Sequence, residues 1–545
     1  METVQTRAML RDARARPSTR TVVLGLAIVL FAAFCVLPVV YMFSVSITNA
    51  AGTLSLDNYR QLFTEPRRRD LLLTSGLLGA GTAIVATILG TPLGLLLARS
   101  DLPAKRLLRM ALVVPLVVPP YVIALAWVLL TGPAGLLARV LGRDLLSDWT
   151  YSLTGAIVVL ALGFCPLSML ATEAAARRVD GRLEEAALLV GRRRRVLYRI
   201  TLPLIAPTVA AAALIIFVLA LSEFGVPALL RVRVFTTEVF TAFAAFYDFG
   251  AGVALSTPLL AVALTAAVAV KLMTGERLLA TRRSTHLGLR FPLGRFRSVA
   301  LAIIGIIIFT AVVLPLAALI TEAGGVENIA SAARASGDAI ANSLSLAFAG
   351  ATLIVALALV LGYGRARARI SFRRFFDPAV ILIFAVPSTV VGIGLIGVWN
   401  RAGVVGHIYS SQWIILVAYL ARFAPLAALI LAASVRQIPS SSEEAAEVAG
   451  ASWLRTFVRI VIPQLRTGLA AAWVVSFIFC FGELGATVLV APPGESTLPV
   501  RVYTLIANTP SSEVASLALM QVGITVLSLV LFSVFVLLKG KRAST

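Results

Sequence analysis

The chain has 545 residues, of which 59% are hydrophobic and only 14% are charged, and its mean hydropathy is +0.94. This composition excludes a water-soluble globular fold and predicts an all-α protein that crosses a membrane many times. The net charge of +22 does not point to nucleic acid, because membrane proteins concentrate lysine and arginine in their cytoplasmic loops. Cys35, Cys165 and Cys480 all lie in apolar runs, so no disulfide framework or cysteine metal site is indicated.

Residues 1–20 are rich in arginine and predict a cytoplasmic tail. The first apolar run, 21–47, is long enough to span a bilayer and has no evident cleavage site, so we expect an uncleaved anchor. Together with later runs it predicts about twelve membrane-spanning helices. The later runs are 71–98, 107–131, 152–172, 204–221 and 252–273, followed by 299–320, 340–363, 376–399, 413–433, 469–490 and 514–538.

These helices form two parallel repeats of six. The first half is predicted at 21–274, with its core at about 71–273, and the second at 299–545, with its core at about 338–538. A basic cytoplasmic linker, 275–298, joins them. Lysine and arginine concentrate in the loops that this topology leaves inside, and both chain ends are expected there. The run Arg67 to Arg69, in an outer loop, is the exception.

Two polar stretches share one pattern, which is Glu-Ala-Ala, three residues, Gly and a later Pro. We call 180–203 the first loop and 441–463 the second loop. Alanines and an acidic first turn predict a short helix, the glycine a bend, and the proline the start of another helix. Ser441 and Glu444 have the spacing of a capping box. The shared residues are Glu185, Ala186, Ala187, Gly191 and Pro203 in the first loop, and Glu444, Ala445, Ala446, Gly450 and Pro463 in the second.

The two loops differ in one respect. The segment from Gly191 to Pro203 is one residue shorter than the segment from Gly450 to Pro463. The first loop also carries a basic run, Arg192 to Arg195, that the second lacks. The geometry of the second part of the first loop is therefore left open, while its role is expected to be the same.

These loops resemble the cytoplasmic EAA loops of binding-protein-dependent ABC importer permeases, which dock into the ATPase subunit. The resemblance implies a permease with both halves fused in one chain, in the bacterial inner (plasma) membrane. It implies a dimeric ABC ATPase and a periplasmic substrate-binding protein as partners. The sequence has no Gly-x-x-x-x-Gly-Lys-Ser/Thr phosphate loop, so ATP hydrolysis is expected on the partner, and no cofactor is expected. Gly392 and Gly394 are interpreted as small residues in helix packing.

Three charged residues fall at membrane depth, where charge is costly and usually functional. Glu223 and Glu483 lie at equivalent positions of the two halves, each followed by a glycine, Gly225 or Gly485. They are candidates for the translocation pathway or its outer gate, or they face water at the headgroups. Arg422 has two open interpretations, which are a structural partner such as a helix carbonyl and a contact with the substrate.

The substrate is less well defined by the sequence. Fused permeases of this kind resemble those of ferric-iron importers most closely, and similar ones carry thiamine or aminophosphonates. Ferric iron favours hard oxygen ligands, of which Glu238, Tyr247 and Asp248 offer some in one outer loop. Alternatives from other classes are a secondary transporter, since two parallel six-helix repeats also occur there, and a membrane enzyme. Neither alternative accounts for two Glu-Ala-Ala loops.

Overall fold

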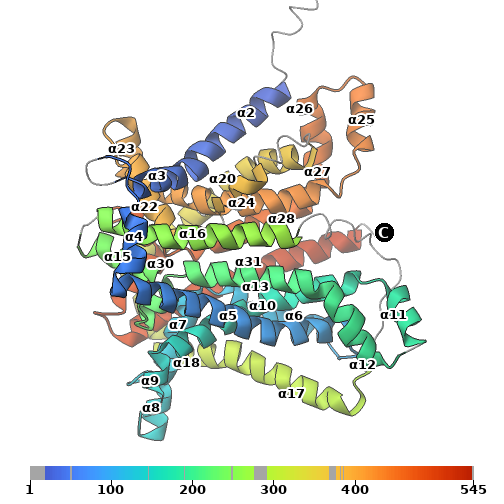
Figure 1. Cartoon of the computed structure of the whole chain (residues 1–545), viewed down its shortest axis with the longest axis horizontal. Coiled ribbons are helices and arrows are strands. Elements are labelled where there is room, and N and C mark those ends of the chain that lie inside the picture. The colour runs from blue at the N-terminus through green and yellow to red at the C-terminus, as the bar shows by residue number, and fades with distance from the viewer. Residues whose placement is uncertain are drawn as a thin grey trace, which may run out of the picture.

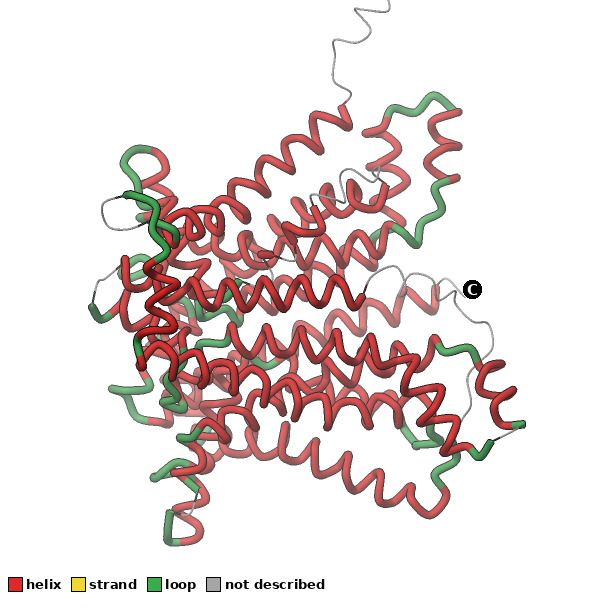
Figure 2. The backbone as a smooth tube through the Cα atoms, viewed as in Figure 1, coloured by secondary structure: helices red, strands yellow, loops and turns green. Residues whose placement is uncertain are grey.

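The computed structural model describes residues 19–48, 52–144, 146–189, 191–246, 249–274, 291–367, 376–380, 382–383 and 386–542. In this part of the chain the regular structure is helical throughout, joined by turns and loops (Figure 2). The long helices lie side by side and form one bundle (Figure 1). The predicted all-α fold is confirmed.

Nine helical stretches of the described residues are long and apolar enough to cross a membrane. They become ten if the pair Trp453–Gln464 and Arg466–Phe481, bent by 74°, counts as one span. Two further expected spans contain shorter apolar helices, Gly250–Ala266 and Ser388–Trp399. The chain is therefore a polytopic membrane protein.

The first half begins with α2 (Thr19–Phe31), the π-helical turn η1 (Ala32–Val36) and α3 (Leu37–Ser46). The remaining elements are α4 (Asp57–Thr64), α5 (Pro66–Arg99), α6 (Lys105–Val117), α7 (Pro120–Thr131), α8 (Leu136–Leu141), α9 (Ser147–Thr150), α10 (Leu153–Arg178), α11 (Gly181–Leu188), α12 (Arg193–Val196), η2 (Leu197–Thr201), α13 (Leu202–Ser222), α14 (Gly225–Leu229), α15 (Phe235–Ala244) and α16 (Phe249–Thr274).

The second half begins with η4 (Gly294–Phe296), α17 (Arg297–Ile308), η5 (Phe309–Val313) and α18 (Leu314–Ala323). The remaining elements are α19 (Val326–Ala335), α20 (Gly337–Arg367), α22 (Ser388–Trp399), α23 (Val404–Tyr409), α24 (Trp413–Val435), α25 (Ser441–Val448), α26 (Trp453–Thr456), η6 (Phe457–Val461), α27 (Ile462–Gln464), α28 (Arg466–Phe481), α29 (Thr487–Val490), α30 (Leu498–Leu505) and α31 (Ser511–Arg542).

Two spans that we expected to be continuous are interrupted. The run 107–131 divides into α6 and α7 at Val118 and Pro119, because a residue that precedes proline avoids the helical conformation. The run 469–490 divides into α28 and α29, with Glu483 in the non-helical segment between them. Both predictions of a single helix were wrong. Each break leaves backbone groups that need partners at membrane depth.

The initial helices of each half pack against the other half. The segment α2–η1–α3 lies along α20, α24 and α22 of the second half, while α17, η5 and α18 lie along α6 and α7 of the first. Aromatic rings strengthen the first of these contacts, since Phe34 stacks on Trp399 with ring centroids 5.5 Å apart. The halves are interlocked as well as repeated.

Gly394 allows a close approach in this interlock. A Cβ atom at this position of α22 would lie 2.7 Å from the carbonyl oxygen of Pro38 in α3. No side chain fits at that distance without a shift of the backbone. The interpretation of Gly394 as a helix-packing residue is confirmed.

Replacing this glycine tests the interlock. We expect Gly394→Ala to destabilise the fold by about 1–3 kcal/mol, because overpacking forces helices apart. The measurement is the midpoint of thermal unfolding in detergent. Gly305→Ala on α17 is the matched control, since nothing lies within 4 Å of its added Cβ. Equal midpoints for the two variants would contradict the close contact between α22 and α3.

Candidate functional site: two Glu-Ala-Ala loops and a central charge cluster

The two loops lie at the same end of the bundle, where α11 and α25 project at the right of Figure 1. In the first loop, α11 begins after Asp180, whose carboxylate accepts a hydrogen bond of 3.1 Å from the N–H of Arg182. In the second loop, α25 begins at Ser441, and its cap residue, Ser440, makes no side-chain capping bond. Ser441 is therefore inside the helix, and the predicted capping box was wrong.

The missing residue of the first loop does not shorten its turn. Four residues separate α11 from α12, as four separate α25 from α26, but the motif glutamate is the fifth residue of α11 and the fourth of α25. In the second loop, Gly450 adopts a φ of +79°, a conformation that suits glycine. Beyond the turn, each second helix runs through a π-helical turn, η2 or η6, to the loop proline. After the proline the loops differ, because the first helix continues to Ser222 as one stretch, whereas the second bends by 74° between Gln464 and Arg466.

Each loop presents an acidic and apolar surface away from the bundle. Glu185 and Glu444 are exposed, and so are the alanines that follow them. Leu189 and Val448 occupy equivalent positions and expose 89% and 90% of their surface. Exposed apolar side chains at repeated positions are typical of a protein-binding surface. The second alanine of each motif instead turns towards the bundle, since Ala187 is half-buried and Ala446 is buried.

A residue that the sequence analysis missed holds the first loop in place. Glu184, one position before Glu185, is fully buried and forms an ion pair of 3.1 Å with Arg99 at the end of α5. Its carboxylate also accepts a hydrogen bond of 2.7 Å from the hydroxyl of Thr201. One buried carboxylate therefore connects α11 to α5 and to the start of α13.

The second loop is held in the same way. Glu443 lies one position before Glu444 and pairs with Arg367, at the end of α20, at 2.8 Å. The hydroxyl of Tyr363 donates to the same carboxylate at 2.8 Å. The available signal in the sequence was the doubled glutamate of each loop, although the sequence does not reveal which arginine each glutamate meets.

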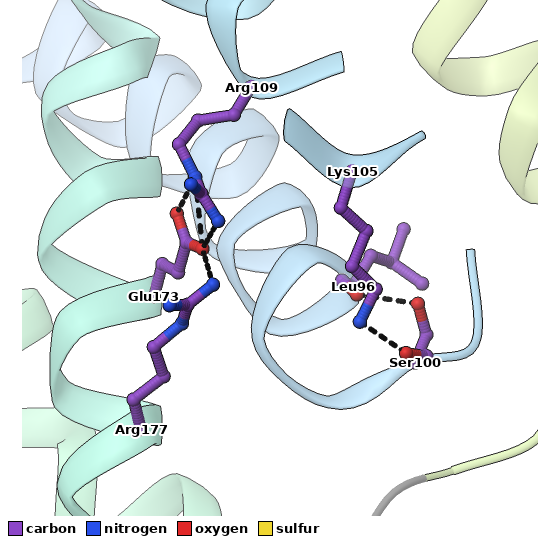
Figure 3. A network of polar contacts seen from close by, with 6 residues as sticks. All are labelled: Leu96, Ser100, Lys105, Arg109, Glu173 and Arg177. Carbon is purple, nitrogen blue, oxygen red and sulfur yellow. Dashed lines mark hydrogen bonds and ion pairs between the residues drawn. The ribbon is translucent and has the colours of Figure 1, made fainter. Parts of the chain in front are cut away.

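A neighbouring network fixes the corner between α5, α6 and α10 (Figure 3). Glu173 of α10 accepts hydrogen bonds from Arg109 at 2.9 Å and from Arg177 at 2.6 Å. Near this network, the backbone N–H of Leu293 donates to Asp101 at 2.9 Å, and this bond holds the pKa of that carboxyl below its usual range. The beginning of the second half is thus tied to the end of α5.

The glutamates at membrane depth cap the helices that follow the breaks. Glu483 accepts hydrogen bonds of 2.9 Å from the N–H groups of Ala486 and Thr487, and a further one from the Thr487 hydroxyl. Glu223 accepts one bond of 3.0 Å from the N–H of Gly225. Glu483 is only 6% exposed, so the alternative in which it faces headgroup water does not apply.

Arg422 completes what we call the central charge cluster, which consists of Glu223, Glu483 and Arg422. The charge of Arg422 is attracted to both carboxylates. Its guanidinium also donates a long hydrogen bond of 3.4 Å to the carbonyl of Val386, at the start of α22. The structure therefore gives Arg422 a carbonyl partner just before a helix, together with attraction to two glutamates of opposite halves, and a contact with the substrate stays a prediction.

Three aromatic rings, one of them next to Glu223 in the chain, meet between the halves and form what we call the aromatic closure. Phe224 lies 4.9 Å from Phe240 of α15 and 5.5 Å from Tyr503 of α30, between ring centroids. Phe240 and Tyr503 belong to different halves and meet edge to face at 6.0 Å. The two halves therefore touch across their interface in this conformation.

The stretches that follow the two glutamates are in contact across the halves. A Cβ atom at Gly225 would lie 3.4 Å from Leu484, and one at Gly485 would lie 3.7 Å from the Cβ of Phe224, which are ordinary contact distances. Glycine is required by other neighbours, because a Cβ at Gly225 would lie 2.6 Å from the Cβ of Tyr121 and one at Gly485 would overlap the hydroxyl of Ser388. The equivalent stretches around Glu223 and Glu483 therefore pack against each other.

Two serines support the helices that carry the aromatic closure. Ser75 of α5 accepts a hydrogen bond of 3.0 Å from the N–H of Phe235, at the start of α15. Ser343 of α20 accepts one of 2.5 Å from the N–H of Leu498, at the start of α30. The sequence analysis did not identify either serine, because a lone serine in an apolar run carries no distinctive pattern.

Of the proposed oxygen ligands for iron, only Glu238 lies in the part of the chain that the structure describes. Glu238 forms an ion pair of 2.8 Å with Arg67 and is mostly buried. Tyr247 and Asp248 lie outside the described residues. Among the residues that the structure describes, no three His, Cys, Asp or Glu side chains are grouped to hold a metal ion.

The unequal capping of the two breaks gives a stability test. We expect Glu483→Leu to cost about 2–5 kcal/mol, because it leaves the N–H groups of Ala486 and Thr487 without their acceptor and removes a negative charge that attracts Arg422. Glu223→Leu leaves the N–H of Gly225 without its acceptor and should cost about 1–3 kcal/mol. Thermal unfolding in detergent measures both. A larger loss for Glu223→Leu would contradict the assigned capping bonds.

Comparison with known proteins gives the family. The model of the family "binding-protein-dependent transport system inner membrane component" matches residues 90–283 and 354–542, once in each half. The Fe(3+)-transport system permease protein FbpB 2 of Haemophilus influenzae is 26% identical over 485 residues, which are 87% of this chain and 91% of that protein. The putative ferric transport system permease protein FbpB 1 of the same organism is 24% identical, over 87% of this chain and 77% of its own length.

A shorter match extends the comparison. The molybdenum transport system permease protein ModB of Mycobacterium tuberculosis is 35% identical over 167 residues, which are 30% of this chain and 62% of that protein.

The family implies an ATPase and a binding protein as partners, and it removes the secondary-transporter and enzyme alternatives. With two copies of the family's domain in one polypeptide, the chain belongs to the inner membrane components of binding-protein-dependent transport systems and is the permease of an ABC importer, not its ATPase.

Proposed function

We propose that this permease forms the membrane pathway for ferric iron delivered by a periplasmic binding protein. The support for iron is the similarity to two ferric permeases over most of the chain. The central charge cluster is consistent with a cationic substrate, since two carboxylates outnumber one guanidinium. Iron is the transported solute in this account, and no resident metal is needed.

We propose that the two loops are the surfaces that bind the ATPase. The observation that carries this proposal is their common pattern, in which Leu189, directly after α11, and Val448, the last residue of α25, are almost fully exposed at equivalent positions of the motif. Both helices lie at one end of the bundle. The exposed Glu185 and Glu444 lie on the same surfaces and offer charge to the partner. Both chain ends and both loops then face the cytoplasm, as the positive-inside rule favours.

The pathway lies between the halves, at the central charge cluster. The equivalent stretches that contain Gly225 and Gly485 meet there, and the aromatic closure seals the side nearer to α15 and α30. Binding of ATP would close the ATPase dimer, bring the two loops together and separate the halves at the aromatic closure. Hydrolysis would return the pathway to the closed conformation.

We place the domain boundaries accordingly. Residues 1–20 form a cytoplasmic tail, 21–274 and 299–545 the two halves, and 275–298 the linker between them. The first helices of each half are assigned to that half by their order in the chain, although they are interlocked with the opposite half.

The test is ATP hydrolysis in proteoliposomes that contain this chain and the ATPase of its own system. The matching periplasmic binding protein is added with ferric iron, molybdate, thiamine or 2-aminoethylphosphonate. We expect ferric iron to stimulate hydrolysis and to enter the vesicles. Stimulation by another solute alone would refute the iron assignment and leave the importer class intact.

A double variant controls for docking. Leu189→Asp with Val448→Asp places two charges on the apolar surface of the loops, so we expect the ATPase to dissociate and stimulation to disappear. Leu54→Asp, at an exposed apolar residue outside the loops, should behave like the wild type. Full stimulation of the double variant would exclude the loops as the docking surface.

A further inference from the structure

We propose that α5 and α20 are the levers that connect the ATPase to the aromatic closure, and that the ion pairs Arg99–Glu184 and Arg367–Glu443 are their joints. The proposal rests on the docking role given to the loops above. It assigns positioning roles to four residues that contact neither partner nor solute. The argument begins with the joints.

The first joint gathers several elements around one buried charge pair. Arg99 and Glu184 expose 5% and 0% of their side chains. Arg99 also donates to the carbonyl of Ala176 in α10 at 2.6 Å, and Glu184 accepts from Thr201 in η2. If α11 moved and α5 did not, the charges of Arg99 and Glu184 would be separated in a medium of low dielectric constant, which is costly. The two helices are therefore expected to move together.

The second joint repeats the arrangement with different supports. Arg367 pairs with Glu443 and donates to the carbonyl of Ile438 at 2.7 Å. Tyr363, one turn earlier in α20, donates to Glu443 and accepts a hydrogen bond of 3.2 Å from the indole of Trp453 in α26. This joint is more accessible, with exposed fractions of 17% and 15% for the charge pair.

Each lever reaches the aromatic closure at its other end. Ser75 of α5 holds the start of α15, which carries Phe240, and Ser343 of α20 holds the start of α30, which carries Tyr503. The same number of residues separates Ser75 from Arg99 as separates Ser343 from Arg367. At 1.5 Å per helical residue, each lever is roughly 36 Å long between its two attachments.

The matched spacing explains how one movement reaches both ends of the membrane. A hydrogen-bonded helix transmits displacement without a separate relay, because bending it costs backbone bonds that have no water to replace them. The helix α20 has no internal proline, whereas α5 contains Pro92, which removes one backbone bond, and yet stays helical from Pro66 to Arg99. The loops and the aromatic closure are thus attached to the same two rigid bodies. When the loops move towards each other, α5 and α20 tilt as rigid bodies. Their other ends, with the starts of α15 and α30, then move apart.

The test compares transport with ATP hydrolysis in the complete complex of permease, ATPase and loaded binding protein. Glu184→Gln and Glu443→Gln each weaken one joint while leaving the exposed Glu185, Glu444, Leu189 and Val448 unchanged. We expect each variant to copurify with the ATPase and to keep its stimulated hydrolysis. The solute transported per ATP should fall about fivefold or more, the scale of an ordinary coupling energy.

Glu173→Gln is the matched control. Glu173 is equally buried and ion-paired at the same end of the bundle, but its partners, Arg109 and Arg177, hold α6 and α10 and no loop helix (Figure 3). It should lower the thermal midpoint as the joint variants do, and leave transport per ATP unchanged. Ser75→Ala and Ser343→Ala, at the other end of the levers, should lower that ratio.

Three results would overturn the proposal. One is a joint variant that keeps the wild-type ratio, and another is a Glu173→Gln variant that lowers it as much. The third is loss of the ATPase from both joint variants, because the joints would then serve docking. A wild-type complex without stimulated hydrolysis would instead refute the proposed function, so the two failures are distinguishable.

Discussion

Two buried carboxylates attach the loops of this permease to its membrane bundle. Glu184 and Glu443 each meet an arginine at the end of a long helix, and each lies next to a glutamate that faces outward. The adjacent positions differ in their surroundings, because one glutamate of each pair holds the loop while the other is exposed on the surface that we propose for the ATPase.

The two halves repeat each other in the proposed joints and levers and differ at the central charge cluster. The pairs Arg99–Glu184 and Arg367–Glu443 and the helices α5 and α20 recur with the same spacing, whereas Phe224 has Leu484 as its counterpart. Arg422 has no basic counterpart, since Gly163 takes the equivalent place. Arg422 is attracted to two carboxylates from opposite halves, so the three charges of the central charge cluster are not distributed symmetrically between the halves. The presence of two carboxylates beside one arginine is the feature that we connect with the cationic substrate proposed above.

Much of this organisation could be predicted from the sequence. Bilayer thickness sets the length of the apolar runs, and the duplicated loop pattern consists of residues that are close together in the chain. Both can therefore be recognised in a single sequence. The breaks at Pro119 and Glu483 were missed because the flanking runs are apolar enough to hide them. Glu184, Ser75 and the interlock of α3 with α22 were missed because their partners are far away in the chain, and only three-dimensional packing identifies them.

The central claim is that the two ends of the bundle move in opposite directions on ATP binding. Spin labels on cysteines at Arg178 and Gln437, exposed just before the two loop helices, report one end. Labels at Arg233 and Pro493, exposed before α15 and α30, report the other. In the complex with a hydrolysis-deficient ATPase, ATP should shorten the first distance and lengthen the second. A shorter first distance with an unchanged or shorter second distance would contradict the account.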